Sequence, residues 1–377
     1  MTGQVVVIRL PAMGSIQQWH RSIITGQARK PAAIAISACL RLASHAYSIG
    51  IRTRNILYDT GVLPVRRIGL PVISIGNITA GGTGKTPMVV WLCKRLTDDL
   101  GIEPSAIAIL TRGYKTRAKK QIDEPSLLSG ACPGVAILVD PDRARAARMA
   151  LKQGLQVIVM DDGFQHRRLH RDMDILMIDG TCPFGYGRLL PAGLLREPVS
   201  EIRRAKAAVI TRSDLVKPGQ IQQIERSLRA LAPGLLIARA IHRPIQVKTL
   251  AGSVIKAHEL SGMKVYAFCG IGNPDAFLAT LRALGAYLVG TQVFDDHHHF
   301  TRDQINQICE DALRSGARLI VTTEKNWLGL EQAWFRPDLP AGYLQVRLEL
   351  VHCQKALLQL IGSVLSAYRP AGQSSMV

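Results

Sequence analysis

The feature that most restricts the fold of this chain is a glycine-rich segment between a predicted strand and a predicted helix. Pro71–Ile75 (PVISI) has the apolar, β-branched composition of a buried strand, and Gly76–Thr86 (GNITAGGTGKT) follows it directly. A helix pattern begins at Pro87. Glycines let backbone N–H groups turn inward around phosphate oxygens, and the N-terminus of the helix adds a partial positive charge. The order strand, loop, helix therefore predicts a phosphate-binding loop.

Individual positions of this loop carry separate expectations. Lys85 is expected to reach the β- and γ-phosphates of a nucleotide, and the Thr86 hydroxyl to bind Mg²⁺. Thr79 stands where the usual pattern has glycine, and the Gly81-Gly82 pair can supply the bend instead. A glycine turn with an unrelated lysine is the alternative, but it leaves the order of strand, loop and helix unexplained. The predicted nucleotide-binding residues are Thr79, Ala80, Gly81, Gly82, Thr83, Gly84, Lys85 and Thr86.

Two adjacent carboxylates end another predicted strand. Val157–Met160 is apolar, and Asp161 and Asp162 follow it. In enzymes with a phosphate-binding loop, a carboxylate at the end of a neighbouring strand holds Mg²⁺ directly or through water. Asp161 and Asp162 are therefore predicted near a metal together with Thr86. The alternative is a strand-end turn in which an aspartate only caps the backbone.

Beyond Pro71, short β-branched runs alternate with helix patterns, which indicates an α/β fold. Continuous apolar strands separated by helices are typical of a parallel sheet with helices on both faces, as in P-loop NTPases. The predicted strands are 71–75, 106–110, 135–139, 157–160, 175–178, 207–210, 265–269, 287–293, 319–322 and 343–348. The predicted helices are 88–100, 143–153, 220–232, 274–284 and 302–315.

The length of 377 residues favours more than one domain. Leu235–Leu250 is rich in β-forming residues but contains Pro244, so it is interpreted as an extended connector or ribbon. The predicted division is a basic, amphipathic N-terminal region at 1–60, a P-loop core at 61–245, and a smaller α/β domain at 246–377.

The N-terminal region contains apolar segments with basic residues around them. Pro31–Leu40 is shorter than the roughly 20 residues that a membrane-spanning helix needs, and it is too far from the N-terminus for a cleaved export signal. The next segment mixes apolar residues with Arg41, His45, Arg52 and Arg54, which suits an amphipathic helix on an anionic membrane surface. A helix packed on its own domain is the open alternative. No other segment is expected to span a bilayer.

The charge of the chain calls for polyanionic partners. Lys and Arg number 47 against 28 Asp and Glu, a formal net charge of +19. Nucleic acid is disfavoured as the partner, because basic residues are scattered and aromatic residues, at 5%, offer few stacking surfaces. The seven cysteines form no CxxC pair, which argues against a zinc ribbon or disulfide scaffold and favours a reducing compartment.

Two further segments have several interpretations. Ala207–Asp214 (AAVITRSD) resembles the base-reading loop of GTPases, but Arg212 replaces the lysine, and a plain strand-to-helix turn is favoured. Asp295–Phe300 (DDHHHF) is dense in ionisable groups. Acid–base chemistry is favoured there over metal binding, because consecutive residues rarely face one ion together, and a solvated turn is the third interpretation.

Several ordered motifs together resemble the tetraacyldisaccharide 4′-kinases, the lipid A 4′-kinases of Gram-negative bacteria. The resemblance extends from about Arg54 to Trp327. It rests on RNILY at 54–58, GNITAGGTGKTP at 76–87, TRGY at 111–114, DEP at 123–125, DDGFQH at 161–166, GYGRLLPAG at 185–193, LREP at 195–198, GIGNP at 270–274, DHH at 296–298 and TTEK at 322–325.

The resemblance implies an ATP- and Mg²⁺-dependent lipid kinase. It implies transfer of the γ-phosphoryl of ATP to the 4′-hydroxyl of an acylated glucosamine disaccharide 1-phosphate, giving lipid IVA. It further implies a peripheral, monotopic monomer on the cytoplasmic face of the inner membrane, bound to its anionic surface. The family has two α/β domains joined by a short ribbon, with catalysis in the cleft between them.

The resemblance also assigns roles to single residues. Lys85 would contact the terminal phosphates, and Asp123 would accept the proton of the sugar hydroxyl with His297 as its partner. Arg196 and Glu197 would lie near the transferring phosphoryl. Three positions depart from the family pattern. Ile122 replaces the usual Gly before Asp-Glu-Pro, Asp295 replaces Pro before Asp-His-His, and Asn326 replaces Asp after Thr-Glu-Lys.

A second hypothesis from another class is a nucleotide-switched, membrane-associated P-loop ATPase of the partition or carrier type. Such proteins share the Gly-Gly-x-Gly-Lys-Thr loop but often carry a lysine just before the paired glycines, where this chain has Ala80. Their switch function needs no sugar site. Dependence of ATP turnover on a lipid acceptor distinguishes the two hypotheses.

Overall fold

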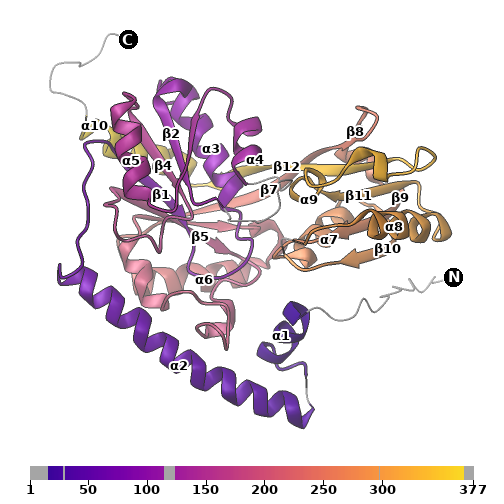
Figure 1. The fold of residues 1–377 in the computed structure, drawn as a ribbon, viewed down its shortest axis with the longest axis horizontal. Coiled ribbons are helices and arrows are strands. Elements are labelled where there is room, and N and C mark those ends of the chain that lie inside the picture. The colour runs from indigo at the N-terminus through magenta and orange to yellow at the C-terminus, as the bar shows by residue number, and fades with distance from the viewer. Residues whose placement is uncertain (1–15, 29, 114–123, 297, 369–377) are drawn as a thin grey trace. The chain divides into compact units, whose positions relative to one another are not determined.

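The computed structural model describes residues 16–28, 30–113, 124–296 and 298–368, which fall into two compact units. We call residues 34–241 and 348–368 the P-loop unit, and residues 242–347 with the described residues up to Ala33 the second unit. The chain leaves the P-loop unit between Ile241 and His242, within strand β7 (Leu236–Thr249). It returns to that unit between Arg347 and Leu348, within strand β12 (Ala341–His352), and Figure 1 labels both strands.

The P-loop unit is built on a parallel sheet, as the sequence predicts. Its strand order is β7-β6-β5-β1-β4-β2-β3, and each of these neighbouring pairs is parallel. Because parallel strands end at the same edge, β1 and β4 place the P-loop and the paired aspartates side by side, with Ile75 opposite Asp161. The strands are β1 Val72–Gly76, β2 Ile107–Thr111, β3 Ala136–Val139, β4 Val157–Asp161, β5 Met173–Asp179, β6 Ala207–Thr211 and β7 Leu236–Thr249.

Helices cover both faces of this sheet. Alternate residues of a strand point to opposite faces, so Val157 and Val159 face one core while Ile158 and Met160 face another. Helices α3, α4 and α10 pack on the first face, and α5 and α6 on the other. Their bounds are α3 Lys85–Asp98, α4 Glu124–Ala131, α5 Arg143–Lys152, α6 Pro218–Leu231 and α10 Gln354–Ser366. The predicted fold class is confirmed.

The second unit repeats the α/β pattern on a smaller scale. Its strand order is β10-β9-β11-β12-β7, with β8 antiparallel to β7 and parallel pairing from β10 to β12. Helix α7 packs on one face and α8 on the other. The elements are β8 Val254–Lys256, β9 Lys264–Cys269, α7 Pro274–Ala283, β10 Tyr287–Val293, α8 Arg302–Arg314, β11 Leu319–Thr323, α9 Glu324–Trp327 and β12 Ala341–His352, with α1 Ile16–Ile24 in the N-terminal segment.

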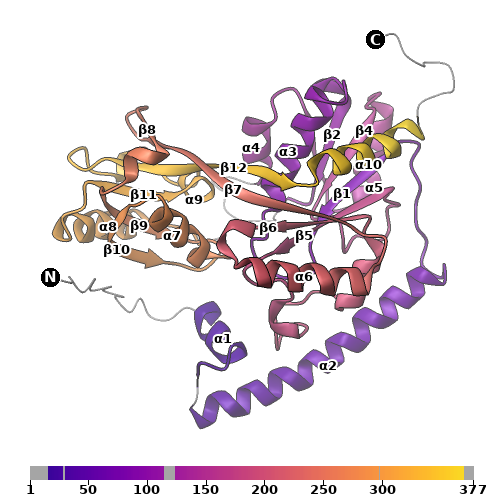
Figure 2. The ribbon, with the colours of Figure 1, turned by 180° about the vertical axis from the view of Figure 1, so that it is seen from behind.

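The structure bears on the predicted domain division at two places. The segment around Pro244, predicted as an extended connector or ribbon, is part of one continuous strand, β7, which passes from the P-loop unit to the second unit between Ile241 and His242. The predicted second domain at 246–377 also contains α10, which Figure 2 shows with the P-loop unit. The reason is packing, because Leu357 and Ile361 are fully buried in the same core as α3.

Short 3-10 turns lie at Pro104–Ala106, Gly185–Gly187, Val199–Arg204, Ser213–Leu215, Ala257–Leu260 and Gln332–Trp334.

Helix α2, Pro31–Asp59, is longer than the predicted apolar stretch. Among the described residues it is the single helix whose length and composition would allow it to cross a membrane. The sequence analysis ends the apolar stretch at Leu40, whereas the helix continues past Arg41 without a break. Large apolar side chains at every second turn are exposed on one face of α2: Ile34 at 63%, Leu42 at 74%, Ile49 at 67% and Ile56 at 58%.

Candidate functional site

The loop between β1 and α3 has the backbone conformation of a phosphate cradle. Gly81 and Gly84 have positive φ angles of 114° and 88°, and Gly81 belongs to the Gly81-Gly82 pair that the sequence analysis proposes for the bend. Gly84 is also the N-cap of α3, so the helix begins at Lys85 with its N-terminal N–H groups at the loop. The buried Asn77 side chain donates a hydrogen bond of 3.0 Å to Thr83 and closes the loop across its base.

Thr79 does not need the conformational freedom of glycine. It lies in an antiparallel bridge with Leu195, and hydrogen bonds on either side join Ala80 N to Leu194 O at 2.6 Å and Arg196 N to Ile78 O at 2.7 Å. The first part of the loop is therefore extended and paired with residues 194–196. This pairing explains why a β-branched residue stands where the usual pattern has glycine.

Asp162 is the carboxylate on which the basic groups converge. Lys85 Nζ lies 3.4 Å from Asp162 Oδ1, and Arg196 Nη1 lies 3.0 Å from Asp162 Oδ2. Burial acts to raise the pKa of Asp162, but Lys85 and Arg196 outweigh it, and the pKa falls below its usual range. The carboxylate is therefore ionised at neutral pH, and it brings the P-loop lysine and Arg196 to one point.

Asp161 precedes this residue but occupies a different environment. Its exposed fraction is 3%, and its backbone oxygen accepts a hydrogen bond of 3.3 Å from Arg143 Nη2. The side chains of Thr86, Asp161 and Asp162 offer the oxygen ligands that Mg²⁺ prefers, and all three lie at the carboxyl edge of β1 and β4. The donor set therefore fits the predicted metal in kind.

Glu197 lies next to Arg196 in the chain but is completely buried. Its carboxylate pairs with Arg54 of α2 at 2.5 Å and with Arg204, whose guanidinium lies over the Phe164 ring at 4.0 Å. Burial raises the pKa of Glu197, while Arg204 and Arg54 act in the opposite direction. Arg196 thus points to Asp162, and Glu197 points into an arginine cluster behind it.

Residues 211–214, at the carboxyl end of β6, hold the P-loop rather than present a free side chain. The Arg212 guanidinium donates 2.8 Å to Gly82 O and pairs with Asp179 at 2.6 Å, and Thr211 Oγ1 donates 3.1 Å to Thr83 O. Arg212 Nη atoms are therefore committed to the loop and to β5. The geometry favours the predicted strand-to-helix turn over the guanine-reading alternative.

Two basic residues near the aspartates, Arg143, which is buried, and His166, which is partly buried, were not singled out from the sequence. Arg143 has an exposed fraction of 4%, and its Nη1 donates 3.0 Å to Asp140 O. Burial lowers the pKa of Arg143, and Asp161 and Asp162 oppose this. Burial and then the guanidiniums of Arg143 and Arg171 lower the pKa of His166 to about 4. A histidine four residues after Asp162 was the available signal, but its partial burial depends on tertiary packing.

The match to known proteins covers both units. The family model for tetraacyldisaccharide-1-P 4′-kinase matches residues 36–366. The chain belongs to this family. A tetraacyldisaccharide 4′-kinase from Anaeromyxobacter dehalogenans strain 2CP-C is 38% identical over 323 residues, which are 80% of this chain and 84% of that protein. The corresponding protein from Syntrophus aciditrophicus is 36% identical over 85% of this chain and 91% of its own length.

A solved structure supports the same family assignment. The LpxK structure from Aquifex aeolicus, described as a complex with ATP, matches with a TM-score of 0.65 and 29% identity. The match covers 88% of this chain and 99% of that one. The family resemblance predicted from the motifs is therefore confirmed.

The second unit contains two of the family motifs, DHH at 296–298 and TTEK at 322–325. Lys325 Nζ pairs with Asp296 Oδ1 at 3.0 Å. The His298 ring stacks on Phe294 at 4.6 Å and its Nε2 lies 3.0 Å from Gln304 Oε1, so it is held by packing. Within the described ranges, no group of three or more His, Cys, Asp or Glu side chains is placed to hold a metal. Asp123 and His297 lie outside the described residues.

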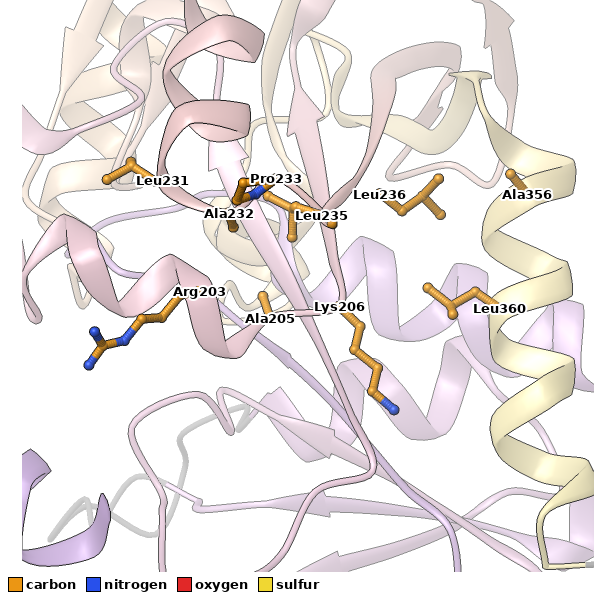
Figure 3. A pocket seen from close by; sticks show the side chains of 11 residues that line it. Arg203, Ala205, Lys206, Leu231, Ala232, Pro233, Leu235, Leu236, Ala356 and Leu360 are labelled. Carbon is orange, nitrogen blue, oxygen red and sulfur yellow. The ribbon is translucent and has the colours of Figure 1, made fainter. Parts of the chain in front are cut away.

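A hollow of about 820 Å³ in the P-loop unit lies away from this chemistry (Figure 3). It is lined by Lys206 and Leu236, at the amino ends of β6 and β7, and by Leu360 of α10. The P-loop and the aspartates follow the carboxyl ends of β1 and β4, which is the opposite edge of a parallel sheet. The hollow is therefore not the candidate active site.

Proposed function

We propose that this protein is a tetraacyldisaccharide 4′-kinase, which transfers the γ-phosphoryl of ATP to the 4′-hydroxyl of tetraacyldisaccharide 1-phosphate. The observation that carries the proposal is the convergence of Lys85 and Arg196 on Asp162 beside the P-loop, in a chain that belongs to the kinase family. Phosphoryl transfer depends mainly on positioning and on neutralising charge, and this arrangement supplies both.

The nucleotide would lie against residues 79–86, with its phosphates at the N-terminus of α3. Lys85 would bind the terminal phosphates, and Arg196 would neutralise charge on the transferring group. Thr86, Asp161 and Asp162 would hold Mg²⁺, which supplies further neutralisation of the phosphate oxygens when bound. Arg212 and Thr211 keep the loop in shape through Gly82 and Thr83.

The acceptor hydroxyl is a poor nucleophile at neutral pH and needs a group that takes its proton. The family resemblance assigns this role to Asp123 and the supporting role to His297, and both assignments stay predictions. An aspartate has an intrinsic pKa of about 3.9, so a histidine that holds it or relays the proton would assist transfer. The family resemblance also assigns Glu197 to the neighbourhood of the transferring phosphoryl, and this assignment stays a prediction too.

A lipid acceptor supports a location at a membrane surface, and α2 is the element we assign to that contact. Its exposed face combines Leu42 and Ile49 with Arg41 and Arg52, the composition of a helix that lies in an anionic interface. Its opposite face makes hydrogen bonds to the P-loop unit through Ser44 and Tyr47. A helix bound to protein along one face favours peripheral attachment over a crossing. The inner-membrane location, the monomeric state and the lack of a nucleic-acid partner stay predictions.

The test is incubation with γ-labelled ATP and the acylated disaccharide 1-phosphate, followed by lipid extraction. The expected result is label in the lipid fraction, with ATP turnover that requires the acceptor. ATP turnover of the same rate without acceptor, and no labelled lipid, would support the nucleotide-switched ATPase of the partition or carrier type instead.

A further inference from the structure

Helix α2 is bonded to the polypeptide that borders the P-loop. Ser44 Oγ donates a hydrogen bond of 2.9 Å to the carbonyl of Leu189, and the Tyr47 hydroxyl donates one of 2.9 Å to the carbonyl of Arg196. Both acceptors belong to the loop that runs from Gly185 to Arg196. Because Ser44 and Tyr47 lie three residues apart, they project from the same face of the helix, opposite to its exposed apolar residues.

The same loop is bonded to the P-loop on its other side. Arg196 N donates to Ile78 O at 2.7 Å, and Thr79 bridges Leu195. The backbone of Arg196 is therefore fixed at both of its polar groups, since Ile78 accepts from its N–H and Tyr47 donates to its carbonyl. Its side chain reaches Asp162 from this fixed backbone.

A second anchor follows immediately in the chain. The buried Glu197 carboxylate pairs with Arg54, two turns after Tyr47 on α2, and with Arg204. The helix thus holds residues 196 and 197 through one hydrogen bond and one ion pair. The Arg54–Glu197 ion pair fixes where the loop lies. The Tyr47 hydroxyl instead bonds the carbonyl of Arg196, the residue whose guanidinium reaches Asp162.

We propose that Tyr47 is a positioning residue for phosphoryl transfer, which holds the Arg196 carbonyl so that the Arg196 guanidinium stays at Asp162 beside Lys85. The proposal rests on the proposed kinase function and adds a residue of the membrane-side helix to its machinery. Tyr47 touches neither reacting group and acts through Arg196. Its hydroxyl remains a donor throughout the neutral range, because burial raises the pKa of Tyr47.

Tyr47→Phe tests the proposal, because it removes the hydroxyl and keeps the ring. We expect kcat to fall about three- to tenfold, the range for loss of one neutral hydrogen bond. The KM for ATP should stay within about twofold, because most contacts to ATP come from the P-loop. The melting temperature should change little, since the ring packing is retained. Tyr58→Phe is the matched control, because Tyr58 lies on the same helix and offers its ring to Arg167, which phenylalanine retains.

The coupling to Arg196 is tested by a double-mutant cycle. In the Arg196→Ala background, Tyr47→Phe should reduce kcat by less than about twofold, because the group that Tyr47 positions is gone. An undiminished loss in that background, a kcat of Tyr47→Phe near that of the wild type, or an equal loss in Tyr58→Phe would overturn the proposal. The wild-type enzyme in the same lipid-labelling assay separates these outcomes from failure of the kinase function, which would leave no labelled lipid in any sample.

Discussion

Lys85 carries the first prediction at the scale of single residues. It lies at the N-terminus of α3, 3.4 Å from Asp162, and in the proposed reaction its charge bears on the phosphates in both the bound and the transition state. Lys85→Ala should therefore weaken ATP binding and also lower kcat by about 10²–10³-fold, as for removal of one preorganised donor. Equilibrium ATP binding and lipid labelling measure the two effects separately.

The control for this variant is Lys94→Ala, which removes an exposed lysine from the same helix. It should leave both quantities unchanged. Normal ATP binding and normal turnover in Lys85→Ala would refute the assignment of the phosphate-binding loop.

His166 gives a prediction about pH. Burial, followed by Arg143 and Arg171, lowers its pKa from 6.5 to about 4 in the folded protein. Between these values the unfolded chain binds a proton that the folded protein does not, so the free energy of unfolding decreases as the pH falls from 6.5 toward 4. After a discount for partial solvent screening, the expected slope is about 1 kcal/mol per pH unit.

His166→Gln should remove this part of the pH dependence, which urea unfolding at pH 6.5 and pH 5 measures. His258→Gln, at an exposed histidine of the second unit, is the control and should keep the wild-type slope. An unchanged slope in His166→Gln would contradict the assignment of the effect to this ring.

Residue identity predicts the site better than it predicts side-chain direction. The motifs predict Lys85 and Asp162 near one another, because both follow predicted strands of one parallel sheet. It does not separate Arg196 from Glu197, since their partners, Asp162 and Arg54, come from distant segments. Asn326 likewise has a partner from a distant segment, Gly270, that the sequence does not reveal. Its Nδ2 donates to Gly270 O while its Oδ1 accepts from Gly270 N, a paired contact that a carboxylate could not make.

At the scale of elements, the exposed face of α2 carries the next prediction. Burying a leucine side chain contributes about 1.5–3 kcal/mol, and an aspartate in its place is also repelled by anionic lipid. Leu42→Asp together with Ile49→Asp should therefore reduce sedimentation with anionic vesicles by more than tenfold, because a tenfold change in affinity corresponds to only about 1.4 kcal/mol. Binding of the wild type should weaken as salt is raised, because Arg41 and Arg52 flank this face.

Val254→Asp is the control, since Val254 is 49% exposed in β8 of the second unit. It should leave vesicle binding unchanged. Binding that is insensitive both to salt and to the two α2 substitutions would exclude this face as the membrane contact.

The success of the element predictions follows from periodicity. The buried parallel strand β4 and the amphipathic helix α8 each carry their pattern within one segment, and their predicted bounds agree with the structure to within one residue. Helix α10 has an apolar pattern as well, but its membership of the P-loop unit depends on the core around Leu357. The segment around Pro244, predicted as an extended connector or ribbon, lies within the strand β7. The placement of α10 depends on partners that are distant in sequence.

At the scale of the whole molecule, the chain distributes the proposed chemistry over two units. Lys85, Asp162 and Arg196 lie in the P-loop unit, whereas His297 belongs to the chain segment of the second unit. The sequence predicts this division near residue 245, and the structure crosses between units at 241 and 242. The return of the chain after Arg347 could not be predicted, because no turn or glycine marks it within β12.

The division leads to the last prediction, which concerns Asp123 and His297. If Asp123 accepts the proton of the acceptor hydroxyl with help from His297, Asp123→Ala and His297→Ala should each lower kcat by about 10²–10⁴-fold. ATP affinity should change little, because neither residue belongs to the predicted phosphate-binding loop at 79–86. The double variant should be hardly slower than the slower single variant, since residues that act in one proton transfer are not additive. Lipid labelling measures turnover, and equilibrium binding measures ATP affinity. Multiplicative losses in the double variant would mean that the two residues act in separate steps, and near-normal turnover in either single variant would remove that residue from the mechanism.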